Sequence, residues 1–400
     1  MRVLQINSLY GFGSTGTIAK LISDEVEKSG GEAFAACRLK DKDYPNVYMI
    51  GNKIDWKFHA LMTRVDGRQG YFSKGATNKL LRHIDNIKPD IVHLHNLHDN
   101  YINFNMLCDY LAKKNIPTVI TLHDCWPFTG KCWYYTAAEC DKWQGDCGSC
   151  PMLKDEVPSW FFDKTAKMLK DKCEHLNKIP SLTLVGCSDW IAEEARKSHL
   201  ASNNIVTIHN GIDLNVFKPI ESDFRTANGI SEGDFVILGV AAQWSERKGF
   251  DVFLKLAEDL SENIKIVLVG KMEDGVKLPE RVIAVPRTES REKLAEIYTA
   301  ADLFVNPTRE EVLGLVNLES LACGTPVLTF RTGGSPECID ESSGSVVDCD
   351  DIEGLEKEIA QICSVRPFTK ENCIRRAKTF DADDKYKEYY DLYCSLQREF

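Results

Sequence analysis

Short apolar runs alternate with amphipathic stretches along the whole chain. Strands that alternate with helices, rather than with tight turns, are typical of a parallel sheet covered by helices on both faces. The pattern therefore predicts an α/β protein. Runs with the length of buried strands lie at residues 3–6, 116–122, 182–186, 235–240, 264–270, 303–305 and 326–330, and helical spacing is clearest at residues 17–27, 160–176, 291–298 and 352–363.

The most informative part of this pattern begins at the apolar run 303–305. A polar loop follows it and ends at Gly314, where a helical pattern begins. The unpaired backbone N–H groups of Gly314 and Leu315 at such a helix start favour an anion. Glu319, about one turn further on, can accept hydrogen bonds from hydroxyl groups beside it. The layout fits a ligand that carries both a phosphate and a sugar.

Glu311 and Glu319, with seven residues between them, are followed by the strings ACGTPV and GGSPE. A spaced pair of glutamates alone is usually two surface carboxylates on a helix. In this setting the stretch resembles the donor-sugar signature of the retaining glycosyltransferases of family 4, also called group 1, which have the GT-B fold. The resemblance implies two Rossmann-like, doubly wound domains that face each other across a cleft. It places Glu311 beside the transferred sugar, as a catalytic residue, and Glu319 on the nucleotide ribose.

The loop AAQWSERKG supplies the expected positive charge. Arg247 and Lys248 follow the apolar run 235–240, and cations at a strand's carboxyl end can neutralise a diphosphate leaving group without a metal. The family usually has an arginine five residues before this lysine, where this chain has Gln243. The resemblance implies that Lys248 is catalytic and that Arg247, Lys248, Gly314 and Leu315 bind the donor, with Arg247 the candidate substitute for the missing arginine.

The first half of the chain carries two further candidates. His123 ends the run 116–122, at the edge where open α/β sheets bind ligands. The resemblance implies a catalytic contact from His123 to the donor sugar, and the alternative is a strand-end histidine capped by Asp124. Gly13 and Gly16 form a turn that lets backbone amides approach a phosphate or sugar, and the resemblance places them at the donor.

Three other histidines, His93, His95 and His98, follow one another closely on the strand before this one. Strand alternation puts His93 and His95 on one face. Buried histidines on such a strand are more often held by hydrogen bonds than by a metal, so a metal is the less favoured interpretation.

The segment HNGIDLNVFKP, which begins at residue 209, resembles the family's interdomain segment. We therefore predict an N-terminal acceptor-side domain over residues 1–200 and a C-terminal nucleotide-sugar-binding domain over residues 201–380. The final helix, residues 381–400, is expected to pack back on the first domain.

Four cysteines lie in an insertion after His123. Cys132, Cys140, Cys147 and Cys150 are separated by seven, six and two residues, and only the last pair has the CxxC spacing of a metal knuckle. Four thiolates could hold a structural zinc ion and so order a loop rich in polar and turn residues. The aromatic residues of the same loop could instead form a small core. No metal is predicted for catalysis.

Composition narrows the remaining possibilities. The 400 residues are 43% hydrophobic, enough for two domains with cores, and the formal charge of -11 argues against a duplex nucleic-acid binder. The 15 cysteines are an odd number scattered through strands and helices, which favours reduced thiols over a disulfide framework. No apolar window has membrane-spanning length, and the chain starts with a strand and a glycine turn rather than a signal peptide. We expect a cytoplasmic protein, at most attached to a membrane surface.

One basic stretch bears on that attachment. Residues 56–88 hold seven Lys or Arg and two Asp, with aromatic residues between them, in a chain that is acidic overall. Such a surface could meet anionic lipid or a lipid-linked pyrophosphate acceptor. A solvated helix pair over the sheet is the simpler interpretation.

The resemblance implies sugar transfer from a nucleotide-sugar to an acceptor hydroxyl, with retention of configuration, in capsule, exopolysaccharide or O-antigen assembly. The acceptor would be a sugar or a lipid-linked saccharide. The alternatives are a nucleotide-sugar epimerase or a phosphorylase of the same fold, or a non-catalytic nucleotide-sugar-binding protein, which Gln243 favours. The sequence leaves the sugar, the base, the linkage and the oligomeric state open.

Overall fold

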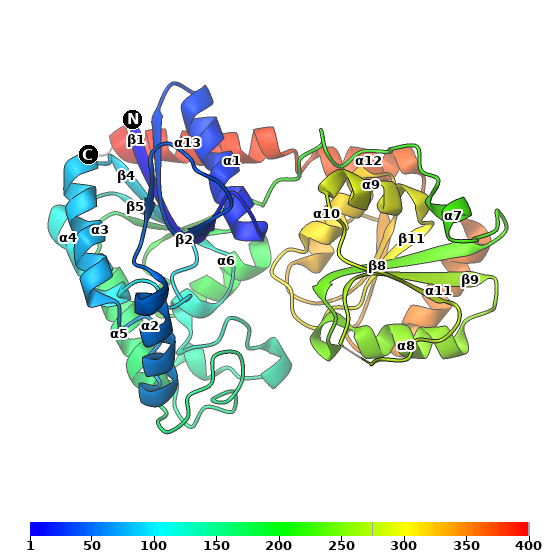
Figure 1. The fold of residues 1–400 in the computed structure, drawn as a ribbon, viewed down its shortest axis with the longest axis horizontal. Coiled ribbons are helices and arrows are strands. Elements are labelled where there is room, and N and C mark those ends of the chain that lie inside the picture. Colours follow the sequence, from blue (N-terminus) through cyan, green and yellow to red (C-terminus); the bar gives the residue numbers. More distant parts are fainter. Residues whose placement is uncertain (274, 399–400) are drawn as a thin grey trace. The chain divides into compact units, whose positions relative to one another are not determined.

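The computed structural model describes residues 1–273 and 275–398, which form two compact α/β units (Figure 1). The first unit comprises Met1–His209 and Lys385–Phe400, and the second comprises Asn210–Asp384. The predicted division fell nine residues earlier along the chain, at 200, and four residues earlier at the C-terminal end, at 380. The α/β class predicted from the alternating pattern is confirmed.

The first unit contains a seven-stranded parallel sheet with the strand order β3-β2-β1-β4-β5-β6-β7. Its strands are β1 (Arg2–Tyr10), β2 (Glu32–Lys40), β3 (Val47–Met49), β4 (Ile91–Leu94), β5 (Thr118–Leu122), β6 (Leu182–Gly186) and β7 (Asn204–Thr207). Its helices are α1 (Ser14–Lys28), α2 (Lys53–Asp66), α3 (Lys74–Ile87), α4 (Phe104–Lys114), α5 (Thr165–Asn177), α6 (Asp189–Arg196) and most of α13 (Ala382–Arg398). The order reverses between β1 and β4, so the carboxyl ends of these strands form the position where open α/β sheets bind ligands.

The second unit contains a six-stranded parallel sheet with the order β10-β9-β8-β11-β12-β13. Its strands are β8 (Phe235–Gln243), β9 (Ile264–Lys271), β10 (Val282–Val285), β11 (Leu303–Asn306), β12 (Val327–Phe330) and β13 (Gly344–Val347). Its helices are α7 (Phe224–Ala227), α8 (Phe250–Asp259), α9 (Arg291–Ala300), α10 (Leu315–Ala322), α11 (Ile352–Val365) and α12 (Lys370–Lys378). Here the order reverses between β8 and β11.

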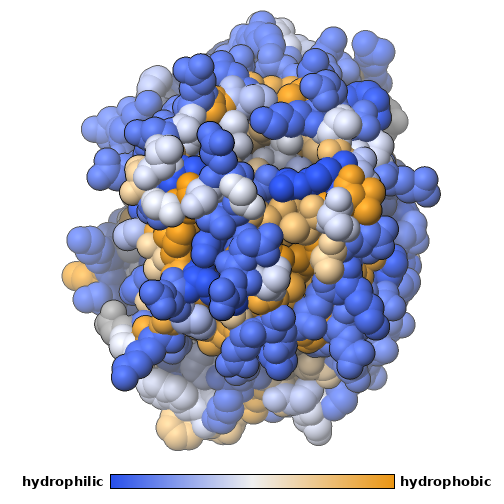
Figure 2. All heavy atoms as spheres, turned by 90° about the vertical axis from the view of Figure 1, so that its right-hand side faces the viewer, coloured by the Kyte–Doolittle hydropathy of each residue, from blue (hydrophilic) through white to orange (hydrophobic). Residues whose placement is uncertain are grey.

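Two apolar clusters stabilise the second sheet, one on each face. Phe235 and Ile237 belong to one cluster, and Val236 and Leu238, the alternating residues of β8, belong to the other. Successive side chains of a strand point to opposite faces, so an apolar run is what a strand buried on both faces requires. On the face of the molecule seen in Figure 2, hydrophilic side chains cover most of the surface and hydrophobic ones show between them.

The predicted helix over residues 160–176 is wrong at its start. Helix α5 begins at Thr165, because the Asp163 carboxylate accepts hydrogen bonds from the backbone N–H and the hydroxyl of Thr165. The three preceding aromatic residues, Trp160, Phe161 and Phe162, lie in a loop and are 46%, 70% and 50% exposed. Helical spacing of the aromatic residues gave no sign of this cap.

The basic stretch 56–88 forms a pair of helices, most of α2 and all of α3. Helix α2 starts with a capping box. The Asn52 side chain accepts hydrogen bonds from the backbone amides of Ile54 and Asp55, and the Asp55 carboxylate accepts one from the backbone amide of Asn52. Among the described residues, no helix is long and apolar enough to cross a membrane.

Candidate functional site

The reversal point of the second sheet brings two predicted residues together. Lys248 ends a short turn after β8, and Glu311 lies in the loop after β11. The Lys248 Nζ lies 2.9 Å from the Glu311 Oε2, and the two side chains are 26% and 18% exposed. The pair is thus shielded from bulk water yet open on one side. These residues are 63 positions apart in the sequence, and only the neighbouring β8 and β11 place them side by side.

Gly249 fixes the position of this lysine. Its φ of 73° is left-handed, and a Cβ there would lie 2.4 Å from the carbonyl oxygen of Pro307. Any larger residue would therefore push the turn after β8 away from the loop after β11. A backbone hydrogen bond of 2.9 Å from the Arg309 amide to the Arg247 carbonyl joins the same two segments.

The two arginines of this region differ from the lysine. Arg309 pairs with Asp251 and Asp350, with N–O distances of 2.8 Å, so its charge is already balanced within the protein. The side chain of Arg247 is 47% exposed, and its NH1 lies 4.0 Å from the Glu310 Oε2. Arg247 is therefore directed to Glu310, while Lys248 is directed to Glu311.

The predicted helix start is present. Gly314 has a φ of 87° and precedes α10 without a side-chain cap, so the first N–H groups of the helix keep the capacity to bind an anion. Behind them, the Asn306 side chain donates to the Asn317 Oδ1 at 2.9 Å within the core. Leu315, the first residue of α10, lies at the position predicted for it.

Glu319 lies one turn further along α10. The Tyr298 hydroxyl donates to its Oε2 at 3.1 Å. Burial raises the pKa of Glu319 to about 7, although the hydrogen bond from Tyr298 and the charge of Arg291 oppose the shift. A carboxyl group with this pKa accepts hydrogen bonds from hydroxyl groups more strongly above neutral pH than below it.

One further cation lies near this site, and the sequence pattern did not reveal it. Lys271, the last residue of β9, pairs in register with Gln243, the last residue of β8, and both are exposed. A lysine therefore neighbours the position where the family usually has an arginine. The available signal was a charged residue directly after an apolar strand. To interpret it one must know that β9 lies next to β8, and the sequence alone does not give this strand order.

In the first unit, three side chains form a chain of hydrogen bonds behind His123. The His123 Nε2 lies 3.0 Å from the His95 Nδ1, and the His95 Nε2 lies 2.8 Å from the Gln5 Oε1. The Gln5 amide nitrogen donates to the Ala19 carbonyl and to the Ser23 hydroxyl, so its oxygen must accept from His95.

This chain sets the tautomer of His123. Burial lowers the pKa of His123 to about 4 and that of His95 well below the usual range, so both rings are neutral at neutral pH. The Nε2–H group of His95 donates to the Gln5 Oε1. The Nδ1 of His95 therefore carries no proton and must accept a hydrogen bond from the Nε2–H group of His123. His123 therefore carries its proton on Nε2 and has its lone pair on Nδ1, where it can accept a hydrogen bond from a hydroxyl group.

The other histidines are held by the protein. The ring nitrogens of His93 lie 2.6 Å from the Tyr393 hydroxyl and 2.8 Å from the Thr121 hydroxyl. The His98 Nε2 lies 2.8 Å from the Asp124 Oδ2. The hydrogen-bonded interpretation of this group is the one that the contacts favour. Asp124 pairs with His98 and so does not cap His123 as the alternative supposed.

The glycine turn after β1 lies beside these histidines in the strand order. Gly13 has a φ of 67° and precedes α1. A Cβ on Gly16 would lie 3.1 Å from the backbone carbon of Leu9. The close approach of α1 to β1 therefore depends on glycine at position 16.

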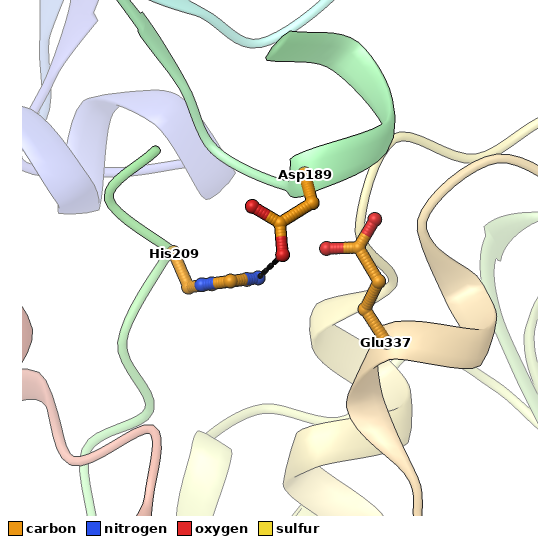
Figure 3. A group of neighbouring side chains, drawn as sticks. All are labelled: Asp189, His209 and Glu337. Carbon is orange, nitrogen blue, oxygen red and sulfur yellow. Dashed lines mark ion pairs between the residues drawn. The ribbon is translucent and has the colours of Figure 1, made fainter. Parts of the chain in front are cut away.

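A second polar pair, which the sequence pattern did not reveal, lies near the end of the unit, where the His209 Nε2 is 3.9 Å from the Asp189 Oδ2 (Figure 3).

Two family models match the chain. The model "Glycosyltransferase Family 4" matches residues 23–216, and the model "Glycosyl transferases group 1" matches residues 221–380. Among curated proteins, D-inositol 3-phosphate glycosyltransferase of Mycolicibacterium smegmatis is 31% identical over 180 residues, which are 41% of this chain and 41% of that protein. The chain thus matches less than half the length of this relative.

Solved structures resemble the chain over its full length. Sucrose-phosphate synthase from Thermosynechococcus elongatus superposes with a TM-score of 0.74 at 16% identity, and 100% of each chain is covered. Anabaena HepE in complex with UDP-glucose gives a TM-score of 0.67 at 15% identity, covering 99% of this chain and 100% of that one. At these identities the likeness shows the fold. With the two matched models and the two Rossmann-like sheets, it establishes that the chain belongs to the group 1 glycosyltransferases of the GT-B type.

Proposed function

We propose that this protein transfers a sugar from a nucleotide-sugar donor to an acceptor hydroxyl, with retention of the anomeric configuration. The observation that carries the proposal is the pair formed by Lys248 and Glu311 at the reversal point of the second sheet. In sugar transfer the bond to the departing diphosphate breaks and leaves a cationic sugar and an anionic nucleotide. A site with one cation and one carboxylate can stabilise both charges as they develop.

Each residue then has a definite role. Lys248 and the uncapped N–H groups at Gly314 hold the departing diphosphate, and Glu311 holds the transferred sugar. Glu319 accepts hydrogen bonds from the ribose hydroxyls. The first unit contributes His123, whose Nδ1 accepts a hydrogen bond from a hydroxyl of the donor sugar. Gly13 and Gly16 let backbone amides approach the donor.

Lys271 is the candidate substitute for the arginine that the family usually has at position 243. Lys271 on β9 is the in-register neighbour of Gln243 on β8. Arg247, the substitute that the sequence indicated, is directed to Glu310. We assign Lys271 the second contact to the diphosphate.

A UDP-linked sugar is the first donor to test, because the structures of the related HepE contain UDP and UDP-glucose. The proposed setting is polysaccharide assembly. Two solved relatives support it: WaaG, described as a glycosyltransferase involved in lipopolysaccharide biosynthesis, and the lipopolysaccharide outer core galactosyltransferase WaaB. The acceptor is then a sugar or a lipid-linked saccharide.

The first unit also carries a surface suited to a membrane. Ile54, Phe58 and Leu61, at helical spacing on α2, are 79%, 57% and 49% exposed. The loop with the three exposed aromatic residues at positions 160–162 lies against the same helix, because the Trp160 amide donates to the Arg64 carbonyl at 2.7 Å. We call this surface the aromatic face.

Three lysines lie on or next to the aromatic face. Lys53 and Lys57 are exposed on α2, and the Lys164 Nζ lies 5.3 Å from the centre of the Phe162 ring. Exposed aromatic and aliphatic side chains with lysines around them bind the interface of an anionic bilayer. We propose that this face places the protein on the cytoplasmic surface of the membrane, where a lipid-linked acceptor would be found.

Co-sedimentation with vesicles tests the aromatic face. Vesicles with anionic phosphatidylglycerol should retain the protein, and vesicles of neutral phosphatidylcholine should retain less. Phe58→Ser combined with Phe161→Ser should abolish retention. Val365→Ser, which changes an apolar residue that is 65% exposed in the second unit, is the matched control and should leave retention intact. Equal retention of all three proteins would refute the proposal.

A thermal-shift screen against UDP, GDP, ADP, CMP, dTDP and their sugar conjugates tests the enzymatic function first. A nucleotide at a hundred times its Kd stabilises the folded protein by about 2.7 kcal/mol. The nucleotide that responds then enters transfer assays with saccharide acceptors. Conversion of the donor without an acceptor would indicate an epimerase, and a need for inorganic phosphate would indicate a phosphorylase. Binding without turnover would indicate a non-catalytic protein.

A further inference from the structure

The segment between β5 and α5 is long and almost without regular structure. Residues 123–164 contain three short 3-10 turns, η1 (Trp126–Phe128), η2 (Thr136–Ala138) and η3 (Lys142–Gln144), and no other helix or strand. Connections longer than about 15 residues are uncommon in compact domains unless something else orders them. The question is what orders this one.

An aromatic core orders part of it. Phe128, Tyr135 and Trp143 are buried, with ring centres 5.2 Å apart for Phe128 and Trp143 and 5.0 Å apart for Tyr135 and Trp143. The aromatic alternative considered from the sequence is therefore present. The CxxC pair at residues 147–150 is not part of this core, and its turn is held by hydrogen bonds from the Lys142 Nζ to the carbonyls of Gly148 and Ser149 at 3.0 and 2.9 Å.

The four cysteines of the loop gather around one cavity. Cys132, Cys140, Cys147 and Cys150 all line it, and all are half-buried. Its volume is about 20 Å³, which is enough space for one particle the size of a water molecule. The four cysteines come from three separate parts of the loop, so the folding of the loop, and not their spacing in the sequence alone, brings them to one cavity.

Two buried lysines of this region are held by backbone carbonyls. Lys131, which also lines the cavity, is buried, and its Nζ donates to the carbonyls of Met152, Leu153 and Asp155 at 3.0, 3.3 and 2.9 Å. Lys172 is buried as well. Its Nζ donates to the Trp126 carbonyl and lies 4.0 Å from the centre of the Trp126 ring.

The backbone is already arranged around the CxxC pair. Ser149 has a left-handed φ of 44°, which a non-glycine residue adopts only under constraint. The Cys150 amide donates to Asp163 at 2.8 Å, and Asp163 also fixes the start of α5. A Cβ on Gly130 would lie 3.1 Å from the Cβ of Cys147. The turn is thus anchored to a helix on one side and packed against a glycine on the other.

We propose that Cys132, Cys140, Cys147 and Cys150 bind one structural Zn²⁺ ion. Zinc has no geometric preference of its own and takes four thiolates at about 2.3 Å, which puts the sulfurs roughly 3.8 Å apart. Among the described residues, no three of these sulfurs lie within 4.8 Å of one another. Binding therefore draws the sulfurs inward, and the four thiols release four protons to the solvent.

Metal analysis of the whole chain, purified without chelator, is the first test. We expect about one zinc per chain. Replacement of zinc by Co²⁺ should produce the strong thiolate-to-cobalt absorption and the visible bands of a tetrahedral tetrathiolate site. Both readouts are independent of sugar transfer, so failure here leaves the proposed enzymatic function untouched.

Single variants Cys132→Ser, Cys140→Ser, Cys147→Ser and Cys150→Ser should each lose the metal on dialysis against a chelator. Cys363→Ser is the matched control, because Cys363 is half-buried like the four but lies in α11; it should keep one zinc. If a loop variant fails to fold, the cobalt spectrum of the unchanged protein still decides. Folded protein with four free thiols and no metal would overturn the proposal. So would iron in place of zinc, or a disulfide between any of these cysteines in protein alkylated at lysis.

The proposal predicts a local effect of metal removal. His98 packs against Trp133 of the loop, with ring centres 4.8 Å apart, and also pairs with Asp124. Chelation should therefore increase hydrogen exchange and proteolysis within residues 125–164 while the second unit stays protected. Unchanged exchange in the loop after complete metal removal would show that the aromatic core alone orders it.

Discussion

The two sheets present different chemistry at the same topological position. At the reversal point of the second sheet, a lysine and a carboxylate face each other at 2.9 Å. Beside the reversal point of the first sheet, the described contacts of His123, which follows β5, lead to His95 after β4 and to Gln5 on β1, and both of these side chains are neutral. Charged groups suit a diphosphate and a developing cation, and neutral acceptors suit hydroxyl groups. The two sheets thus offer different groups to a ligand, an ion pair in the second unit and neutral hydrogen-bonding side chains in the first.

The largest expected effect comes from the charged pair. Glu311→Gln and Lys248→Ala should each lower kcat about 10²- to 10³-fold, because each removes a group that acts on charge in the transition state. Steady-state kinetics and circular dichroism of both variants are the measurements. Glu353→Gln, an exposed change on α11, is the control. Turnover within a factor of two of the unchanged protein would remove the pair from the site.

A smaller loss is expected from the neutral chain of the first unit. His123→Ala should lower kcat/KM about 10- to 100-fold by removing a hydrogen bond to the donor sugar. His95→Phe should act through His123, because the tautomer of His123 is no longer fixed. His95→Gln restores a group that can accept from His123 and should recover part of the activity, whereas a merely structural role for His95 would leave the two variants equal.

The pH dependence of nucleotide binding should separate the two sites. Burial raises the pKa of Glu319 to about 7, so below pH 7 its carboxyl group is largely protonated and accepts hydrogen bonds less well. The Kd for the nucleotide should therefore rise several-fold, up to about tenfold, from pH 8 to pH 6. Calorimetry of the unchanged protein and Glu319→Gln is the measurement, and the variant should show the weaker dependence.

His123 should add nothing to this profile. Burial lowers the pKa of His123 to about 4, so its ring stays neutral from pH 6 to pH 8. If His123→Ala flattened the pH dependence of binding instead of Glu319→Gln, the assignment of the two residues would be reversed.

The smallest effect distinguishes the two candidate substitutes for the missing arginine. Lys271→Ala should weaken nucleotide binding by about 1 to 2 kcal/mol, or roughly 5- to 30-fold, through loss of a charge-assisted contact. Arg247→Ala should change it less, because that side chain is directed to Glu310. Calorimetry with the nucleoside diphosphate measures both. The opposite ranking would return the second contact to Arg247.

The sequence determined most of the secondary structure and the identity of the charged residues. Strand β6 lies at the predicted residues, 182–186, and α9 and α11 begin where the pattern placed them, at residues 291 and 352. Buried parallel strands are apolar on both faces, so they stand out in a single sequence. Helix starts are less certain: α1 begins three residues before the predicted position, and α5 begins five residues after it, beside the hydrogen bonds from Thr165 to Asp163.

Only the tertiary structure decided which residues meet. The spacing of Glu311 and Glu319 suggested a site, but its lysine comes from the turn after β8, 63 positions before Glu311. Lys271 became a candidate because β9 is the neighbour of β8, and His95 because β4 is the neighbour of β5. The four cysteines share one cavity because a long irregular loop returns to α5. Local spacing fixes which residues share one helix or strand, whereas strand order and loop closure decide which distant side chains share a site, and these depend on the packing of the whole unit.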